Sequence, residues 1–304
     1  MSNVPALFDH ALLAARRSRA LAQPVAFADA GFLRQSALFD LTERLDAVNR
    51  SFAHSLDVDA PDRALAEALL ATGKVEKVSV GTGFAGADID RPQDETGLPL
   101  GDSKDRSGRY DLITSVLSLQ FANDLPGVLI QFRRALKADG LFLGAVFGGD
   151  TLVELREVLL EAESEVLGGA APRVLPFGEV RDMGALLQRA GFALPVADID
   201  TLVVRYGNPL RLLSDLRAMG ATNILKSGAR RPLRRDVLLR AMALYKERFS
   251  EADGKVPATF QIVSLSGWAP HESQQKPLQP GSAKTRLADA LGVAETPAGE
   301  KTGQ

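Results

Sequence analysis

The sequence predicts an α/β protein built on a doubly wound, mostly parallel sheet. Three observations lead to this fold class. Runs rich in β-branched and apolar residues alternate with helical segments between residues 52 and 147. Two of these runs, 110–119 and 141–147, are apolar enough to be buried on both faces, as the strands of a parallel sheet are. The chain of 304 residues, with 45% apolar and 24% charged composition, is also long enough to bury a sizeable core.

The first half of the chain supplies two helices and then the alternating part. Apolar residues at helical spacing predict a surface helix within residues 1–22 and an amphipathic helix over 32–50. The arginines of the first segment also fit a transit peptide, but the acidic Asp9 favours the helix. Periodicity and turn residues then predict strand 52–58, helix 61–72, strand 75–80, a loop over 84–109, strand 110–119, helix 124–140 and strand 141–147.

The second half continues this pattern and ends in a stretch of different composition. We expect helices 151–167 and 177–191, a strand pair near 193–206, helices near 209–219 and 233–249, and strand 258–268. Beyond about Glu272 the periodicity is lost and Gln, Pro, Gly and Ser increase, which predicts a largely disordered tail. The predicted organisation is an N-terminal helical element (1–50), an α/β domain with a helical cover near 209–249 (51–270), and the tail (271–304).

Composition argues against several classes of function. The formal net charge is −2 and both signs interleave, so neither nucleic acid nor an anionic membrane is expected as the main partner. Cysteine is absent, and no apolar run approaches the roughly 20 residues of a membrane span, so we expect no membrane insertion. The histidines, His10, His54 and His271, are scattered, and no metal site is predicted. Neither a nucleophile elbow nor a Walker loop occurs.

A Gly-x-Gly-x-x-Gly pattern at residues 81–86 follows the predicted strand 75–80 and raises the question of a dinucleotide-binding loop. Such a loop turns a strand directly into a helix whose N-terminal amides face the ligand. Here Pro92 and Gly97 follow, and apolar periodicity is missing. The pattern therefore favours a flexible turn over a dinucleotide site.

A better placed ligand loop lies within residues 56–70, where a predicted strand passes straight into a helix. The glycines that would let a ligand approach the backbone are missing, and Asp59 and Asp62 occupy the turn. Two carboxylates at a helix N-terminus satisfy its dipole and leave less of it for an anionic group. The position therefore suits a ligand, but the residues do not suit a phosphate.

Several separated motifs resemble one family. Asp94, Leu98-Pro99, the strand that begins at Tyr110 and the helix expected to end in Leu-Lys-Ala-Asp-Gly follow the order of class I S-adenosylmethionine-dependent methyltransferases. More narrowly, the chain resembles the methyltransferase-fold assembly factors of respiratory complex I, relatives of the malonyl-carrier-protein methyltransferase of biotin synthesis. The motifs that carry this narrower resemblance are VLSLQFANDLP (116–126), FGGDTLVELR (147–156), RAGF (189–192), DGKVPATFQI (253–262) and GW followed by HESQ (267–274). The match runs from about Leu7 to Gly281.

The resemblance implies a seven-stranded sheet of methyltransferase type and S-adenosylmethionine as the cofactor. The cofactor-binding residues that it implies are Asp57, Asp59, Asp94, Ser115, Leu117, Ser118 and Gln120, with Asp94 contacting the adenine amine. It also implies a protein substrate or partner among the complex I subunits, in the cytoplasm of a bacterium or the mitochondrial matrix of a eukaryote. The mitochondrial members are associated with hydroxylating an arginine of such a subunit. No catalytic residue is identified at this level.

Spacing relates the glycine pattern to this fold. Asp57 lies 54 residues before Asp111 and Gly81 only 30 before it, so Gly81 is too close to belong to the first ligand loop. The pattern falls instead at the end of the second strand, where the family usually presents an acidic residue to the ribose, and Gly83 stands in its place. One lost hydrogen bond to a charged group costs about 1.5–3 kcal/mol, so cofactor binding is expected to be weak or lost.

Three functions stay open on this basis. One is S-adenosylmethionine-dependent methylation of a protein in complex I assembly. Another is a non-catalytic assembly factor that keeps the fold and holds a complex I subunit. The third is protein arginine hydroxylation, for which the few histidines offer no mechanism.

Overall fold

A computed structural model of the chain describes residues 6–59, 62–81, 108–226, 232–275 and 292. The chain divides into a first unit, Met1–Pro270, and a second unit, His271–Gln304. Every helix and strand given below belongs to the first unit. The tail that the sequence predicts to be disordered lies outside the described residues from residue 276 onward, apart from Gly292.

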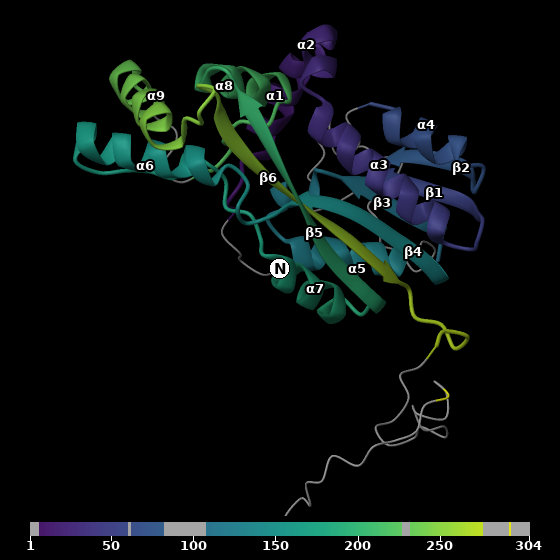
Figure 1. Cartoon of the computed structure of the whole chain (residues 1–304). Helices are drawn as coiled ribbons and strands as arrows, with labels where there is room; N and C mark the ends of the chain where they lie inside the picture. Colours follow the sequence, from purple (N-terminus) through teal and green to yellow (C-terminus); the bar gives the residue numbers. More distant parts are fainter. Residues whose placement is uncertain (1–5, 60–61, 82–107, 227–231, 276–291, 293–304) are drawn as a thin grey trace, which may run out of the picture. The chain divides into compact units, whose positions relative to one another are not determined.

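A mixed sheet forms the centre of the first unit (Figure 1). Its strands are β1 (Phe52–Val58), β2 (Val75–Gly81), β3 (Tyr110–Val116), β4 (Leu136–Phe147), β5 (Ala193–Tyr206) and β6 (Val256–Trp268). In the order β2-β1-β3-β4-β6-β5, the first four strands are parallel and β6 runs antiparallel to both β4 and β5. The α/β sheet is thereby confirmed. The described residues contain six of its strands, so the predicted count of seven is not confirmed, and residues 82–107 lie outside them.

Helices cover both faces of this sheet. They are α1 (His10–Leu21), α2 (Pro24–Asp29), α3 (Phe32–Ala47), α4 (Ala64–Ala71), α5 (Leu125–Ala135), α6 (Val153–Leu167), α7 (Val180–Arg189), α8 (Pro209–Ala218) and α9 (Arg235–Phe249), with a short 3-10 turn, η2 (Leu119–Phe121). Figure 1 shows α3 and α4 on one side of the sheet and α5 and α7 on the other. The alternation along β3 explains this arrangement, since Leu112 packs with the helices of one face and Ile113 with those of the other.

A third apolar cluster joins α6, α8 and α9 to the ends of β5 and β6. In this part, α6 and α9 lie against each other, and Arg240 and Arg248 of α9 pair with Glu165 and Glu161 of α6. The helices predicted near 209–219 and 233–249 correspond to α8 and α9.

The structure corrects two predicted elements. The helix expected over 124–140 ends at Ala135, because the chain from Leu136 already pairs with the sheet and the Gly140 carbonyl accepts from the Ala269 amide at 2.8 Å. The strand pair expected near 193–206 is a single long strand, β5, which pairs with β6 along most of its length. Helix α2 was not predicted at all.

Candidate functional site

The candidate site lies at the carboxyl ends of β1 and β3, which run parallel with Asp57 opposite Thr114. The chain leaves β1 toward β2 on one side and returns as β3 on the other, so the strand order reverses at this point. In open α/β sheets, such a switch point leaves a crevice in which ligands bind. The position of the site therefore follows from the topology.

Two buried acidic residues occupy the end of β1. The side chains of Asp57 and Asp59 each belong to residues only 1% exposed. Asp59 has a φ of 59°, which is the left-handed conformation that glycine adopts most easily and aspartate tolerates. The backbone conformation expected of a glycine loop is thus present here, with a carboxylate where glycine would have left open space.

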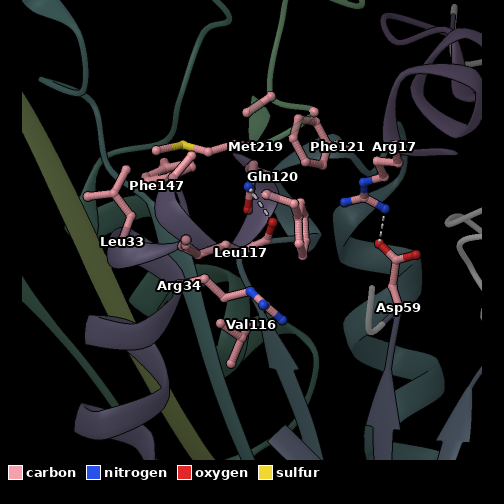
Figure 2. Close-up of a pocket in the computed structure, with 15 residues that line it drawn as sticks. Arg17, Leu33, Arg34, Asp59, Val116, Leu117, Gln120, Phe121, Phe147 and Met219 are labelled. Atoms are coloured by element: carbon pink, nitrogen blue, oxygen red, sulfur yellow. Dashed lines mark hydrogen bonds and ion pairs between the residues drawn. The ribbon is translucent and has the colours of Figure 1, made fainter. Parts of the chain in front are cut away.

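Arginines from the N-terminal helices pair with Asp59 and with the nearby Asp62. The guanidinium of Arg17, on α1, donates to Asp59 Oδ2 at 2.8 Å and lies 5.1 Å from the ring centroid of Phe121 (Figure 2). On α3, Arg34 donates to Asp62 Oδ1 at 2.5 Å. The end of β1 therefore depends for its charge balance on a segment that precedes it in the chain by tens of residues.

The electrostatic environment differs between these carboxyl groups. Burial, followed by the charges of Asp59 and Asp62, raises the pKa of Asp57 well above its ordinary value, while Arg34 acts in the opposite direction. Burial also acts to raise the pKa of Asp62, but the hydrogen bonds from Arg34 and from the Ala64 amide outweigh it and lower this pKa. A positively charged group that entered the site would favour the ionised form of Asp57 and lower its pKa.

Several buried oxygens at the site have no hydrogen-bond partner among the described residues. They are Asp57 Oδ2, Asp59 Oδ1, Ser55 Oγ and Gln120 Oε1. A buried polar atom without a partner costs free energy, and a native site that keeps several of them calls for an explanation. Gln120 Oε1 can only accept hydrogen bonds, and so can Asp59 Oδ1 when its carboxyl group is ionised, which suits a ligand group rich in donors.

At the end of β3, most polar groups have hydrogen-bond partners, and Gln120 Oε1 is the exception among the described atoms of this loop. Leu117 also adopts a left-handed conformation, with φ 49°, and its amide donates to the Ala145 carbonyl at 2.8 Å. The hydroxyls of Ser115 and Ser118 lie 2.8 Å apart and bind each other, and Gln120 Nε2 donates to the Leu117 carbonyl at 2.8 Å. This loop is neutral and is held by contacts within itself and with the neighbouring strands β1 and β4.

A cavity of about 80 Å³ opens between these two strand ends (Figure 2). Its polar lining consists of Arg17, Arg34, Asp59 and Gln120, and its apolar lining includes Leu33, Val116, Leu117, Phe121, Phe147 and Met219. Such a volume holds a small planar group and is below the roughly 300 Å³ of a typical small-molecule pocket.

The residues that the sequence suggested for cofactor binding fall into three groups. Asp59, Leu117 and Gln120 line the cavity. Asp57, Ser115 and Ser118 are buried next to it, each no more than 1% exposed. Asp94 lies outside the described residues.

Sequence reasoning missed Arg17, whose guanidinium contributes to the cavity wall. A signal for it exists, because Leu13, Arg17 and Ala20 share the buried face of α1 at helical spacing. A charged residue on an apolar helical face indicates a buried partner elsewhere in the chain.

The residues around the start of α1 attach this helix to the site. The Phe8 amide donates to Asn123 Oδ1 at 2.7 Å, and His10 Nε2 lies 2.9 Å from the Phe121 carbonyl oxygen. On the other side, the Asp9 amide donates to the Ile224 carbonyl at 2.8 Å. These bonds fix the position from which Arg17 reaches Asp59.

The described residues contain neither a cluster that could hold a metal ion nor a helix that could span a membrane. No group of three or more His, Asp and Glu side chains is arranged to hold a metal ion within the part of the chain that the structure describes. None of the described helices is both long and apolar enough to cross a membrane.

The strand order β2-β1-β3-β4-β6-β5, with helices on both faces of the sheet, is that of an α/β protein of methyltransferase-like fold. A protein of Danio rerio named arginine-hydroxylase NDUFAF5, mitochondrial, is 39% identical over 269 residues, which are 85% of this chain and 81% of that protein. The chain therefore belongs to the family of the NDUFAF5 arginine hydroxylases.

Other relatives match over a smaller share of their length. The Homo sapiens protein of the same name is 44% identical over 196 residues, 64% of this chain and 55% of that protein. A malonyl-[acyl-carrier protein] O-methyltransferase of Laribacter hongkongensis is 36% identical over 58% of this chain and 56% of its own. The chain thus spans little more than half the length of these two relatives.

Family models and solved structures give no further information on the function of the chain. No protein-family model matches the chain. Among solved structures, the YcgJ protein of Bacillus subtilis is 14% identical with a TM-score of 0.47, covering 78% of this chain and 99% of that one. A Burkholderia thailandensis 1,6-didemethyltoxoflavin-N1-methyltransferase is also 14% identical, with a TM-score of 0.43, covering 84% and 88%. These likenesses are too loose to support an argument about function.

Proposed function

We propose that this protein hydroxylates an arginine side chain of a protein partner in the assembly of respiratory complex I, and that the arginine enters the cavity at the ends of β1 and β3. The observation that carries the proposal is the guanidinium of Arg17, which already lies there between the Asp59 carboxylate and the Phe121 ring. Membership of a family whose relatives are named arginine hydroxylases supports it.

The chemistry of the lining suits a guanidinium. This group is planar, carries five N–H donors and stacks on aromatic rings. Asp59 Oδ1 and Gln120 Oε1 are acceptors that no described residue uses, so a second guanidinium beside or in place of Arg17 would find partners. Because both oxygens are shielded from solvent, the entering side chain must displace some of the groups that cover them.

The reaction itself needs more than these residues. Hydroxylation converts a C–H bond of the arginine side chain to C–OH with one atom of dioxygen, and the other atom leaves as water after taking up two electrons and two protons, so dioxygen and a reductant would act as co-substrates. The residues of this chain would bind the guanidinium and orient it against Asp59 and Phe121. The apolar lining of the cavity would exclude water. We place the reaction where complex I is assembled, in the bacterial cytoplasm or the mitochondrial matrix.

The test is mass spectrometry of complex I subunits from cells with and without the gene. The proposal predicts one arginine that carries an additional oxygen atom only when the protein is present. An Asp59→Asn variant, which keeps the shape of the side chain and removes its charge, should abolish the modification. Identical arginine masses in all three strains would contradict the proposal and favour a role in binding alone.

Methyl transfer is a second candidate, supported by the malonyl-[acyl-carrier protein] O-methyltransferase relatives. The ammonium and hydroxyl groups of S-adenosylmethionine are donors, and Asp59 Oδ1, Gln120 Oε1 and the buried Asp57 would accept from them. When bound, this cofactor supplies an electrophilic methyl group. The Asp59 carboxylate and the Arg17 guanidinium fill the space that a glycine loop would leave, which favours weak binding of the cofactor. The same spectra separate the candidates, because a methyl group and an oxygen atom differ in mass.

A further inference from the structure

A large groove runs between α1, α2 and α8, outside the cavity. Its volume is about 990 Å³, and its lining includes Arg16 and Arg19 of α1 and Arg211 and Arg217 of α8. Figure 1 shows these three helices close together at one end of the sheet. Ala30 lines both the groove and the cavity, so the two are adjacent.

The groove carries an excess of positive charge. Arg211 pairs with Asp215 at 3.3 Å, and Asp29 is the other carboxylate of the lining. Within the part of the chain that the structure describes, Arg16, Arg19 and Arg217 form no salt bridge. Burial and then the charge of Arg19 lower the pKa of Arg16, and Asp9 opposes this effect without cancelling it.

An apolar groove of about 480 Å³ adjoins the basic one. Arg16, Arg217 and Thr222 belong to the lining of both. Its floor is aliphatic and includes Leu155, Leu159, Val174, Leu213, Leu216 and Leu238. Ala221 is shared between this groove and the cavity, so both grooves reach the candidate site.

We propose that the two grooves together dock an acidic, amphipathic segment of the protein whose arginine enters the cavity. Its carboxylates would pair with Arg16, Arg19 and Arg217, and an apolar side chain would fill the aliphatic groove. This inference rests on the proposed modification of a protein, and it adds the charge and pattern of the sequence around the modified arginine.

The distribution of the arginines favours a peptide over a single small anion. They come from two different helices and border a space far larger than a phosphate group. A chain with several carboxylates along its length can reach all three, whereas one phosphate or headgroup cannot. The adjoining aliphatic floor offers such a chain an anchor that a free phosphate could not use.

The experiment measures the binding of fluorescein-labelled synthetic peptides by anisotropy. All peptides have the same length and contain one arginine and two leucines, and the remaining positions are glutamate, glutamine or lysine. The proposal predicts that the glutamate peptide binds at least about tenfold more tightly than the glutamine peptide at low salt, and that added salt reduces the difference. Inorganic phosphate and vesicles containing an anionic phospholipid serve as competing probes.

Two matched double variants locate the interaction. Arg19→Glu with Arg217→Glu reverses two exposed charges of the groove and should weaken binding of the glutamate peptide about tenfold. Arg181→Glu with Arg189→Glu reverses two exposed charges on α7, outside the groove, and should leave it unchanged. Thermal unfolding of both variants verifies that the fold is intact.

Equal affinities for the glutamate and glutamine peptides would overturn the proposal, as would equal loss in the two double variants. Preferential binding to anionic vesicles, with no effect of charge among the peptides, would also overturn it. The result is independent of the proposed hydroxylation, since binding is measured without turnover. If the proposed hydroxylation is wrong but the docking is right, the acidic peptide will still bind while the arginine stays unmodified.

Discussion

The ends of β1 and β3 lie side by side and share a left-handed residue, Asp59 in one and Leu117 in the other, yet they are stabilised in different ways. The β3 end is neutral, and the hydroxyls of Ser115 and Ser118 and the Gln120 Nε2 group bind partners within the same loop. The β1 end is acidic and relies on arginines from α1 and α3. The backbone geometry is therefore common to both, whereas the chemistry is not.

This difference couples the site to the N-terminal helices. A glycine loop would need no side chain from elsewhere in the molecule, but a buried carboxylate needs a cation. Because Arg17 supplies that cation and lines the cavity, any ligand of the site must compete or cooperate with α1. Substitutions at Arg17 and Asp57 disturb the β1 end, and a substitution at Gln120 gives the comparison at the β3 end.

The largest effect is expected for Arg17→Ala. It leaves the Asp59 carboxylate buried without its cation, which should lower the free energy of unfolding by about 3–5 kcal/mol. Arg19→Ala, an exposed residue of the same helix, should cost less than about 0.5 kcal/mol. Adding Asp59→Gly to Arg17→Ala removes the buried charge and supplies the residue that the left-handed backbone favours, so stability should recover. Denaturant unfolding measures all three, and a small loss for Arg17→Ala would show that the pair does not hold this loop.

An intermediate, pH-dependent effect is expected for Asp57→Asn. Since burial raises the pKa of Asp57, the folded protein keeps a proton that the unfolded chain has already lost above its ordinary pKa near 4. The stability of the native protein therefore falls with rising pH through this window, by at most about 1.4 kcal/mol per pH unit for one group. The Asp57→Asn variant should not show this loss of stability. Its free energy of unfolding should therefore rise with pH relative to that of the native protein. A difference that stays constant from pH 4 to 8 would contradict the assigned environment.

The smallest effect is expected at the end of β3. Gln120→Ala removes one hydrogen bond to the Leu117 carbonyl from a loop that keeps its other contacts, and it should cost less than about 1 kcal/mol. It should nevertheless weaken binding of an arginine-containing peptide, because Gln120 lines the cavity and its buried Oε1 has no partner among the described residues. Unfolding and peptide titration of the same sample separate the two roles. A large loss of stability would show that the β3 end is less self-contained than its hydrogen bonds indicate.

Local patterns predicted the framework of the fold well. The strand expected over 52–58 has those bounds in the structure, because its apolar residues and the following turn are local signals. The helix expected to end at Gly140 was too long, since pairing of Leu136 with a strand far away in sequence overrides helical propensity. Resemblance supplied the family, which periodicity alone could not.

The candidate site was predicted only in part. The sequence drew attention to Asp57 and Asp59 and to the missing glycines. It did not reveal that Asp59 keeps the left-handed conformation or that Arg17 is its partner. The two residues are 42 positions apart, and which pairs of charges meet across such a distance is decided by tertiary packing.

The most direct test of the central claim is a calorimetric titration with two peptides that differ at one position, arginine in one and the neutral citrulline in the other. If the ends of β1 and β3 form a site for a guanidinium, the arginine peptide should bind at least about tenfold more tightly, because each lost hydrogen bond to a charged group costs about 1.5–3 kcal/mol. The preference should disappear in Asp59→Asn. Equal affinities for both peptides in the native protein would contradict the account.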